Sequence, residues 1–251
     1  MRKRVLVFFM LTAFASFWAW SNLAFAIPIL QTYVEGGTYD SDTETWVIDI
    51  LPGDPIRLWT IGNVDGPGGA GTISDVRLAV AYPDPAGGTV VIDLTPSTTG
   101  DYGGFADDST PSTPTWLQTV TDGSVPKLTG GSDLPSHGIY GDGTHWQEFL
   151  LGNFSLTDSP MADFINSFPI PDHPDDGQIN VYEVVVSGLE VGDWVHFDFY
   201  DSVASGNKTK AKFAPFSHDG GANVVPEPAT MLLLGTGLIG LAAFSRKKLF
   251  K

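Results

Sequence analysis

The 251-residue chain contains no cysteine. This absence excludes a disulfide framework, a thiolate nucleophile and a thiolate metal site. A hydrophobic core or bound metal must therefore hold the fold together. The phosphate-binding glycine loop, the Gly-x-Ser-x-Gly nucleophile turn and the His-Glu-x-x-His metalloprotease motif are also absent. We therefore predict a non-enzymatic protein that needs no cofactor.

Basic residues are few, and most of them lie at the two ends of the chain. The sequence has 13 Lys and Arg against 29 Asp and Glu, and seven of the basic residues fall within 1–4 or 246–251. The segment 27–224 carries 22 more acidic than basic residues. Such a surface repels nucleic acid and anionic lipid, so a nucleic-acid partner is excluded. Divalent cations, basic proteins and neutral glycans are the partners it favours.

The first 26 residues have the three parts of a secretory signal. Residues 2–4 are all basic, 5–19 carry no charge, and 24–26 read Ala-Phe-Ala. We predict a signal peptide over 1–26 that signal peptidase removes before Ile27. A retained membrane helix is the alternative, and it is disfavoured because no basic residue directly follows Ala26.

The last 27 residues contain three ordered elements: a Pro-Glu-Pro motif, an uncharged run over 229–244 and a basic cluster. As a helix, the run of 16 residues spans about 24 Å, short of a hydrocarbon core of ~30 Å. Snorkelling side chains or local thinning of the bilayer close that gap. We predict a transmembrane helix over 229–244, with its basic end in the cytoplasm. The motif is Pro226, Glu227 and Pro228, and the basic cluster begins with Arg246, Lys247 and Lys248.

This arrangement resembles the PEP-CTERM sorting signal. The resemblance implies that an exosortase, a membrane cysteine protease, recognises Pro226-Glu227-Pro228 and removes the tail. It also implies a Gram-negative bacterium in which an inner-membrane intermediate precedes delivery to the cell surface or extracellular matrix. An ordinary tail anchor would explain the apolar run and the lysines, but not the Pro-Glu-Pro motif directly before them.

The segment between the two ends is rich in β-strand patterns. Short runs of β-branched and aromatic residues alternate with Gly- and Pro-rich turns, which predicts an all-β, antiparallel β-sandwich or jelly-roll-like domain over 27–224. Turn-rich connections predict hairpins joining 46–50 to 56–61 and 76–82 to 89–94. A short helical turn is expected over 158–165. Further strands are expected at 178–187, at 194–200 and near 116–120.

The run from Trp194 to Tyr200 alternates strictly between polar and apolar residues. Val195, Phe197 and Phe199 fall on one face of the expected strand. His196 and Asp198 fall on the other, about 7 Å apart. The sequence therefore predicts two chemically useful side chains that point the same way.

Four strings in the second half of the domain resemble the choice-of-anchor N proteins, a bacterial family named for its variable anchors. The resemblance covers roughly residues 136–219. It implies export and an anchored domain, and it implies no reaction. The strings are 136–140 (SHGIY), 144–154 (THWQEFLLGNF), 195–200 (VHFDFY) and 214–219 (APFSHD).

One group of polar residues near the end of the domain is a candidate metal site. Its carboxylates suit calcium, whereas added histidine suits zinc or manganese. The alternative is that these side chains form hydrogen bonds that lock a sheet edge or loop. The candidates are His196, Asp198, Asp201, His218 and Asp219.

Other polar groups have simpler interpretations. His137 and His145 flank Asp142 in a Gly-rich stretch typical of solvated turns, and 172–177 is typical of a tight turn. The sequence Ser217-His218-Asp219 places triad residues side by side, but neighbours in sequence rarely reach relay geometry. The tryptophans could stack on sugar rings, yet core packing is the favoured interpretation.

These observations predict an exported, non-enzymatic structural or adhesive protein linked to exopolysaccharide or biofilm. Its predicted partners are signal peptidase, an exosortase and, before processing, the inner membrane. The alternatives are a calcium- or glycan-binding module and a secreted hydrolase.

Overall fold

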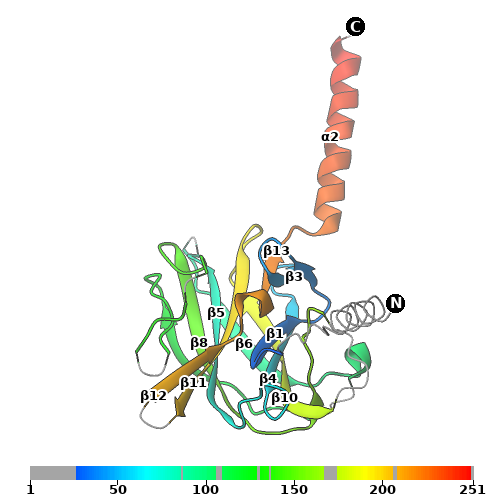
Figure 1. Ribbon diagram of the computed structural model, residues 1–251. Helices are drawn as coiled ribbons and strands as arrows, with labels where there is room; N and C mark the ends of the chain where they lie inside the picture. The colour runs from blue at the N-terminus through cyan, green and yellow to red at the C-terminus, as the bar shows by residue number, and fades with distance from the viewer. Residues whose placement is uncertain are drawn as a thin grey trace, which may run out of the picture.

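The computed structural model (Figure 1) describes residues 27–85, 87–105, 109–128, 131–135, 137–166, 174–205 and 208–249, without the side chains of 202–205, 208–212 and 242–249. The predicted signal segment 1–26 lies outside the described residues. Two β-sheets pack face to face, and one helix projects from them at the C-terminal end. The prediction of an all-β sandwich is confirmed.

Sheet A has the order β1-β4-β10-β6, and β9 pairs with β10. Its strands are β1 (Leu30–Val34), β4 (Pro55–Asn63), β6 (Val91–Ser97), β9 (Ser159–Pro160) and β10 (Asp175–Ser187). Sheet B has the order β2-β3-β13-β11-β5-β8-β7, and β12 pairs with β11. Its strands are β2 (Thr38–Asp40), β3 (Thr45–Ile50), β5 (Ile73–Pro83), β7 (Thr115–Val120), β8 (Thr144–Phe154), β11 (Trp194–Ser205), β12 (Lys208–Phe213) and β13 (Asp219–Val224). Two short 3₁₀ helices, η1 (Tyr102–Gly104) and η2 (Phe216–His218), and the helix α2 (Pro228–Leu249) complete the described elements.

The strand pairing is antiparallel except between β13 and β3, which run parallel. Sheet B is therefore a mixed sheet. This pairing inserts the last strand of the domain between β11, its near neighbour in sequence, and β3, which lies far from it in sequence. β13 is thus the last strand of the sandwich, and it ends directly before the sorting motif.

Hydrophobic clusters cover both faces of each sheet. Leu58 and Phe197 belong to the central cluster between the sheets, whereas Trp59, next to Leu58, belongs to a second cluster with Tyr33 and Phe164. Because side chains alternate along a strand, this second cluster lies on the outer face of sheet A. A third cluster on the outer face of sheet B is formed by Ala79, Ala81, Leu128, Leu134, Trp146 and Tyr200.

The two predicted hairpins are wrong. β3 lies in sheet B and β4 in sheet A, and the same change of sheet occurs between β5 and β6. Turn-rich connections of this length can reverse the chain within a sheet or carry it across the ~10 Å between sheets. The predicted helical turn is also wrong, because Ser159 and Pro160 pair with β10. The strand predicted near 116–120 is present as β7.

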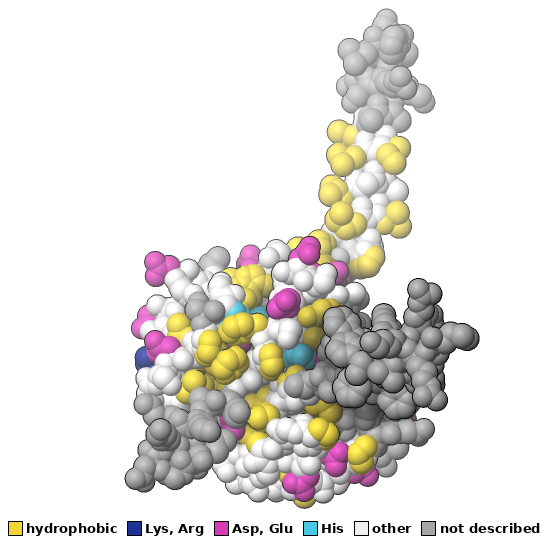
Figure 2. All heavy atoms as spheres, in the orientation of Figure 1, with side chains coloured by type: hydrophobic (Ala, Val, Ile, Leu, Met, Phe, Trp, Pro, Cys, Tyr) yellow, Lys and Arg dark blue, Asp and Glu magenta, His cyan; other side chains and the backbone are white. Residues whose placement is uncertain are grey.

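The helix predicted at the C-terminal end is present as α2. Figure 2 shows hydrophobic side chains along both sides of its described part. Among the described residues, no helix combines the length and the apolar character that crossing a membrane requires. The prediction of a transmembrane helix over 229–244 is therefore not confirmed.

Candidate functional site

The strand β11 presents His196 and Asp198 on the outer face of sheet B. The predicted alternation is confirmed, because Val195, Phe197 and Phe199 all enter the central cluster on the opposite face. The side chains of His196 and Asp198 are only 8% and 4% exposed. A covering layer must therefore lie over this face.

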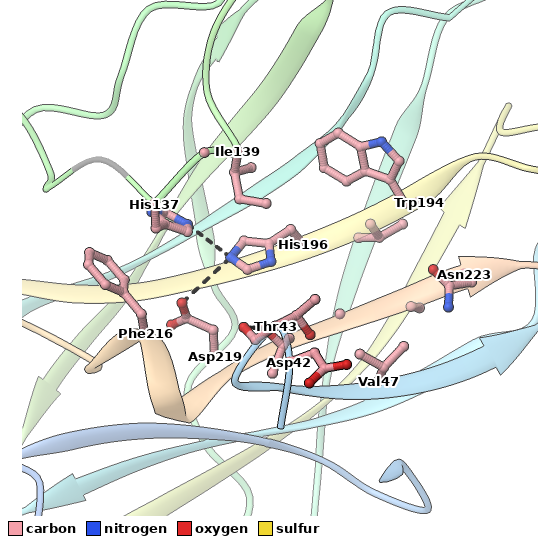
Figure 3. Close-up of a pocket in the computed structure, with 15 residues that line it drawn as sticks. Asp42, Thr43, Val47, His137, Ile139, Trp194, His196, Phe216, Asp219 and Asn223 are labelled. Carbon is pink, nitrogen blue, oxygen red and sulfur yellow. Dashed lines mark hydrogen bonds and ion pairs between the residues drawn. The ribbon is translucent and has the colours of Figure 1, made fainter. Parts of the chain in front are cut away.

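That layer and the neighbouring strand supply two more polar side chains. Asp219 begins β13, which pairs with β11 through Phe197 and Gly220, so its carboxylate lies beside β11. His137 comes from the connection between β7 and β8, whose Leu128 and Leu134 pack on the same outer face. We call His137, His196, Asp198 and Asp219 the four-residue cluster; Figure 3 shows three of them converging at the wall of a cavity.

The donor atoms of the four-residue cluster all lie within 4.8 Å of one another. His137 Nε2 lies 3.1 Å from His196 Nε2 and 3.1 Å from Asp198 Oδ1. His196 Nε2 lies 3.6 Å from Asp198 Oδ1 and 3.7 Å from Asp219 Oδ2. Two imidazoles and two carboxylates thus point at one common centre, and together they could hold a metal ion.

Neighbouring groups fix the orientation of these side chains. His137 Nδ1 lies 3.3 Å from the carbonyl oxygen of Pro135. The ring of Phe216 stacks on that of His137, with centroids 4.7 Å apart and planes 19° apart. The hydroxyl of Tyr140 donates a hydrogen bond to Asp198 Oδ2, the oxygen that does not face the histidines. Such outer contacts hold imidazole and carboxylate ligands in place at metal sites.

Burial and charge separate the pKa values of the two carboxyls. Burial favours the neutral form of Asp198, but the adjacent His196 and His137 outweigh it and lower the pKa of that carboxyl. Burial and the negative charge of Asp198 raise the pKa of Asp219 well above its usual value. Burial alone would lower the pKa of His137, yet its interactions with Asp198 raise it.

A cavity of about 640 Å³ opens beside the cluster, and His137, His196 and Asp219 form part of its wall (Figure 3). Trp194 and Asn223 lie along the same wall, farther from His137. The cavity therefore combines an aromatic ring and an amide with the donor atoms of the cluster, a mixture typical of small-ligand sites.

Two of the predicted metal candidates lie elsewhere. The strand expected over 194–200 continues as β11 to Ser205, so it includes Asp201. Asp201 therefore alternates onto the face opposite Asp198, where it is fully buried. His218 turns the other way from Asp219, and its Nε2 lies 3.2 Å from Asp163 Oδ1. The structure thus brings together three of the five candidates.

The second predicted group, around Asp142, does not converge. His145 Nε2 lies 3.4 Å from the exposed Asp84. His137 instead contacts His196, 59 positions later in the sequence. Sequence reasoning grouped it with its near neighbours, and no spacing signal connects a loop histidine to a distant strand. His173 lies outside the described residues.

Ser217, His218 and Asp163 form a hydrogen-bonded chain that the sequence did not predict. Ser217 Oγ lies 2.9 Å from His218 Nδ1, and His218 Nε2 lies 3.2 Å from Asp163 Oδ1. Burial lowers the pKa of His218. The cavity described above is not lined by Ser217 or His218. These hydrogen bonds therefore connect η2 to the segment after β9, and they do not adjoin the cavity.

The sorting motif lies outside the sandwich. The amide of Val225 still donates to the carbonyl of Ile50 at 2.8 Å. Glu227 and Pro228 are exposed, and α2 begins at Pro228. The amide of Thr230 donates to the carbonyl of Glu227 at 2.9 Å, which makes Glu227 the residue before the first turn. The motif is therefore an accessible junction between domain and tail.

The comparisons with known proteins identify this tail. Residues 224–247 match the PEP-CTERM protein-sorting motif. The motif defines an exported protein that an exosortase sorts. The curated proteins contain no match. The resemblance of 136–219 to the choice-of-anchor N proteins is not shown and stays a prediction.

The comparison with solved structures gives a weak partial match. It is a family 123 glycoside hydrolase from Clostridium perfringens, described in work on glycolipid glycan hydrolysis. The match has 9% sequence identity and a TM-score of 0.26, and covers 79% of this chain and 28% of the hydrolase. This chain thus spans much less than half of that protein, and the match has no bearing on fold or function.

Proposed function

We propose that this chain is a non-enzymatic structural or adhesive component of the cell surface or extracellular matrix, released from its tail by an exosortase. The observation that carries the proposal is the match at 224–247 to the sorting motif, placed directly after β13. Every described strand lies before Val225. Cleavage at the exposed Glu227 junction therefore leaves both sheets intact.

Before cleavage, the tail holds the protein at the inner membrane. Seven described leucine, isoleucine and methionine side chains of α2 are 58–75% exposed, so the domain does not cover them. A hydrophobic helix without protein partners is stabilised by lipid. The basic residues 246–248 follow this helix, and their positive charge favours contact with anionic lipid headgroups.

The acidic surface of the domain suits a secreted matrix component. Figure 2 shows acidic side chains spread over the face in view, with little basic surface among them. Like charge keeps such a domain soluble and away from anionic lipid once its tail is removed. Neutral exopolysaccharide carries no negative charge for this surface to repel, and it is one of the partner classes that the surface accepts.

A second candidate function is a glycan-binding module. The specific observation that favours it is the cavity of about 640 Å³ with Trp194 in its wall. An indole ring presents a flat apolar face on which a sugar ring can stack. Asn223 in the same cavity offers both a donor and an acceptor to hydroxyl groups.

The test of release is the intact mass of the protein in membrane, medium and matrix fractions. Native protein should begin near Ile27 and end near Pro226 in the medium or matrix. Glu227→Ala should retain the tail in the membrane fraction. Glu190→Ala, which removes an exposed acid from the domain, is the matched control and should be processed normally. Retention of the tail in all three proteins would overturn the proposal.

A further inference from the structure

We propose that His137, His196, Asp198 and Asp219 bind one divalent transition metal ion, with zinc as the preferred ion. The inference is independent of how the tail is processed. It concerns a site that ties the connection between β7 and β8 to two strands of sheet B.

The first support is the geometry of the donor atoms. Tetrahedral zinc with bonds of about 2.0–2.1 Å places neighbouring ligand atoms ~3.3 Å apart. Four separations within the cluster are 3.1, 3.1, 3.6 and 3.7 Å, and they lie on both sides of that value. An ion at the centre would match these four separations after small shifts, and it would draw the remaining pairs, which lie within 4.8 Å, closer together.

The second support is the distribution of protons. The carbonyl oxygen of Pro135 can only accept, so the contact at 3.3 Å assigns the proton of neutral His137 to Nδ1. Its Nε2 then presents a lone pair toward His196 Nε2 and Asp198 Oδ1, each 3.1 Å away. Without an ion, a proton shared among these atoms holds the contacts, and a divalent ion at the same centre would take the place of that proton.

The third support is an unused carboxylate oxygen. Asp219 is 2% exposed, and its Oδ1 has no hydrogen-bond partner among the described residues. A buried polar atom without a partner is costly. A metal ion shared between both carboxylate oxygens would give Oδ1 the partner that it lacks.

The ligand types select the class of ion. Calcium takes about 6–8 oxygen ligands, and two of the four atoms here are imidazole nitrogens. Imidazole and carboxylate together suit zinc and its neighbours in the first transition row. Two neutral imidazoles and two carboxylates carry two negative charges, which a divalent ion neutralises. The structure thus favours zinc over the calcium that the carboxylates alone suggested.

The ion would replace the cross-link that cysteine cannot supply in this chain. It would join the loop residue His137 to β11 and to β13. It would also lie beside the cavity, whose wall includes His137, His196 and Asp219.

The test uses the full chain from envelope fractions, purified through a tag without histidine and freed of metal with a chelator. Titration calorimetry with ZnCl₂ should give one site per chain, and CaCl₂ should bind far more weakly. Zinc should also raise the thermal midpoint. His137→Ala and His196→Ala should each weaken zinc binding at least ~100-fold, since each removes a direct ligand. His145→Ala is the matched control, because it removes a histidine outside the cluster and should leave binding unchanged.

Cobalt spectroscopy keeps the test decisive if a variant fails to fold. Co²⁺ added to the wild-type chain should give the intense visible absorption of a four-coordinate ion, and zinc should displace it. A folded wild-type chain that binds neither ion at micromolar concentration would overturn the proposal. The four-residue cluster would then be held together by its hydrogen bonds alone. Equal zinc affinity in wild type, His137→Ala and His196→Ala would overturn it as well.

Discussion

The hydroxyl of Tyr200 on β11 donates a hydrogen bond of 2.7 Å to Glu148 Oε1 on β8, although β5 lies between these two strands. Arg77 on β5 donates to the same oxygen at 3.0 Å, and Gln118 Nε2 on β7 donates to Oε2 at 2.7 Å. Glu148 is 1% exposed. One buried carboxylate therefore links four adjacent strands of sheet B.

Removing the positive partner of this carboxylate should destabilise the sandwich. Breaking a fully buried ion pair from one side costs about 3–5 kcal/mol. Arg77 is 26% exposed, and Tyr200 and Gln118 remain as donors, so we expect Arg77→Met to cost about 2–3 kcal/mol. Urea unfolding measures this change. The double variant Arg77→Met/Glu148→Gln should recover part of the loss, and an unchanged midpoint in Arg77→Met would contradict the role of the pair.

Truncation of Trp59 should be far more costly than truncation of Trp116. Trp59 is fully buried against Tyr33 and Phe105 on the outer face of sheet A, and its indole N–H donates to Glu35 at 3.0 Å. Trp59→Ala should cost about 3–5 kcal/mol, because it leaves a cavity and removes a large apolar surface. Trp116 is 56% exposed, so Trp116→Ala should stay within about 0.5 kcal/mol. Chemical unfolding compares the two.

Asp163 should make the domain sensitive to acid. Its carboxylate accepts hydrogen bonds from Asn166 Nδ2 at 2.8 Å and from the amide of Ile165 at 3.0 Å, and it lies near His218. Burial opposes its charged form, but these contacts outweigh burial and lower its pKa. A carboxyl whose pKa is lower in the folded state stabilises the fold at pH values above its unfolded-state pKa of about 3.9. This contribution is lost as the pH falls through the folded-state pKa.

The comparison of wild type with Asp163→Asn tests this effect. Wild type should be the more stable protein between about pH 5 and pH 7, and the difference should shrink as the pH falls below about 4. Unfolding free energies measured across that range give the difference. A gap that stays constant down to pH 3 would show that the charge of Asp163 does not contribute.

Tyr140 should tune zinc affinity without contributing a ligand atom. Its hydroxyl donates to Asp198 Oδ2 and so orients the carboxylate. Loss of an outer contact of this kind weakens metal binding about 10–100-fold, and Tyr140→Phe should fall in that range with one site retained. Tyr102→Phe is the control, since the Tyr102 hydroxyl contacts Tyr33 in the other sheet. Calorimetric titration with zinc distinguishes the two variants, and equal affinities would argue against this role for Tyr140.

Removal of the tail should leave the sandwich unaltered. A chain that ends at Pro226 keeps β13 and the hydrogen bond from Val225 to Ile50. Its thermal midpoint should therefore equal that of the full chain. A chain that ends at His218 lacks β13, which joins β3 to β11, and should show no cooperative melting. Differential scanning calorimetry gives both results; a lower midpoint for the chain that ends at Pro226 than for the full chain would mean that α2 stabilises the domain.

The sequence by itself determined the features that depend on neighbouring residues. The sorting motif is a linear signal, so its order along the chain was enough to find it. The faces of Val195, His196 and Asp198 followed from the two-residue repeat of an extended chain. The all-β class followed in the same way from short alternating runs bounded by turns.

Only the tertiary structure decided which distant residues meet. His137 reaches His196 across 59 positions because its loop packs on the outer face of sheet B. Asp219 joins them because β13 pairs beside β11. Whether a short connection makes a hairpin or crosses between sheets depends on where each strand buries its apolar face. Those contacts are long-range, and local sequence does not specify them.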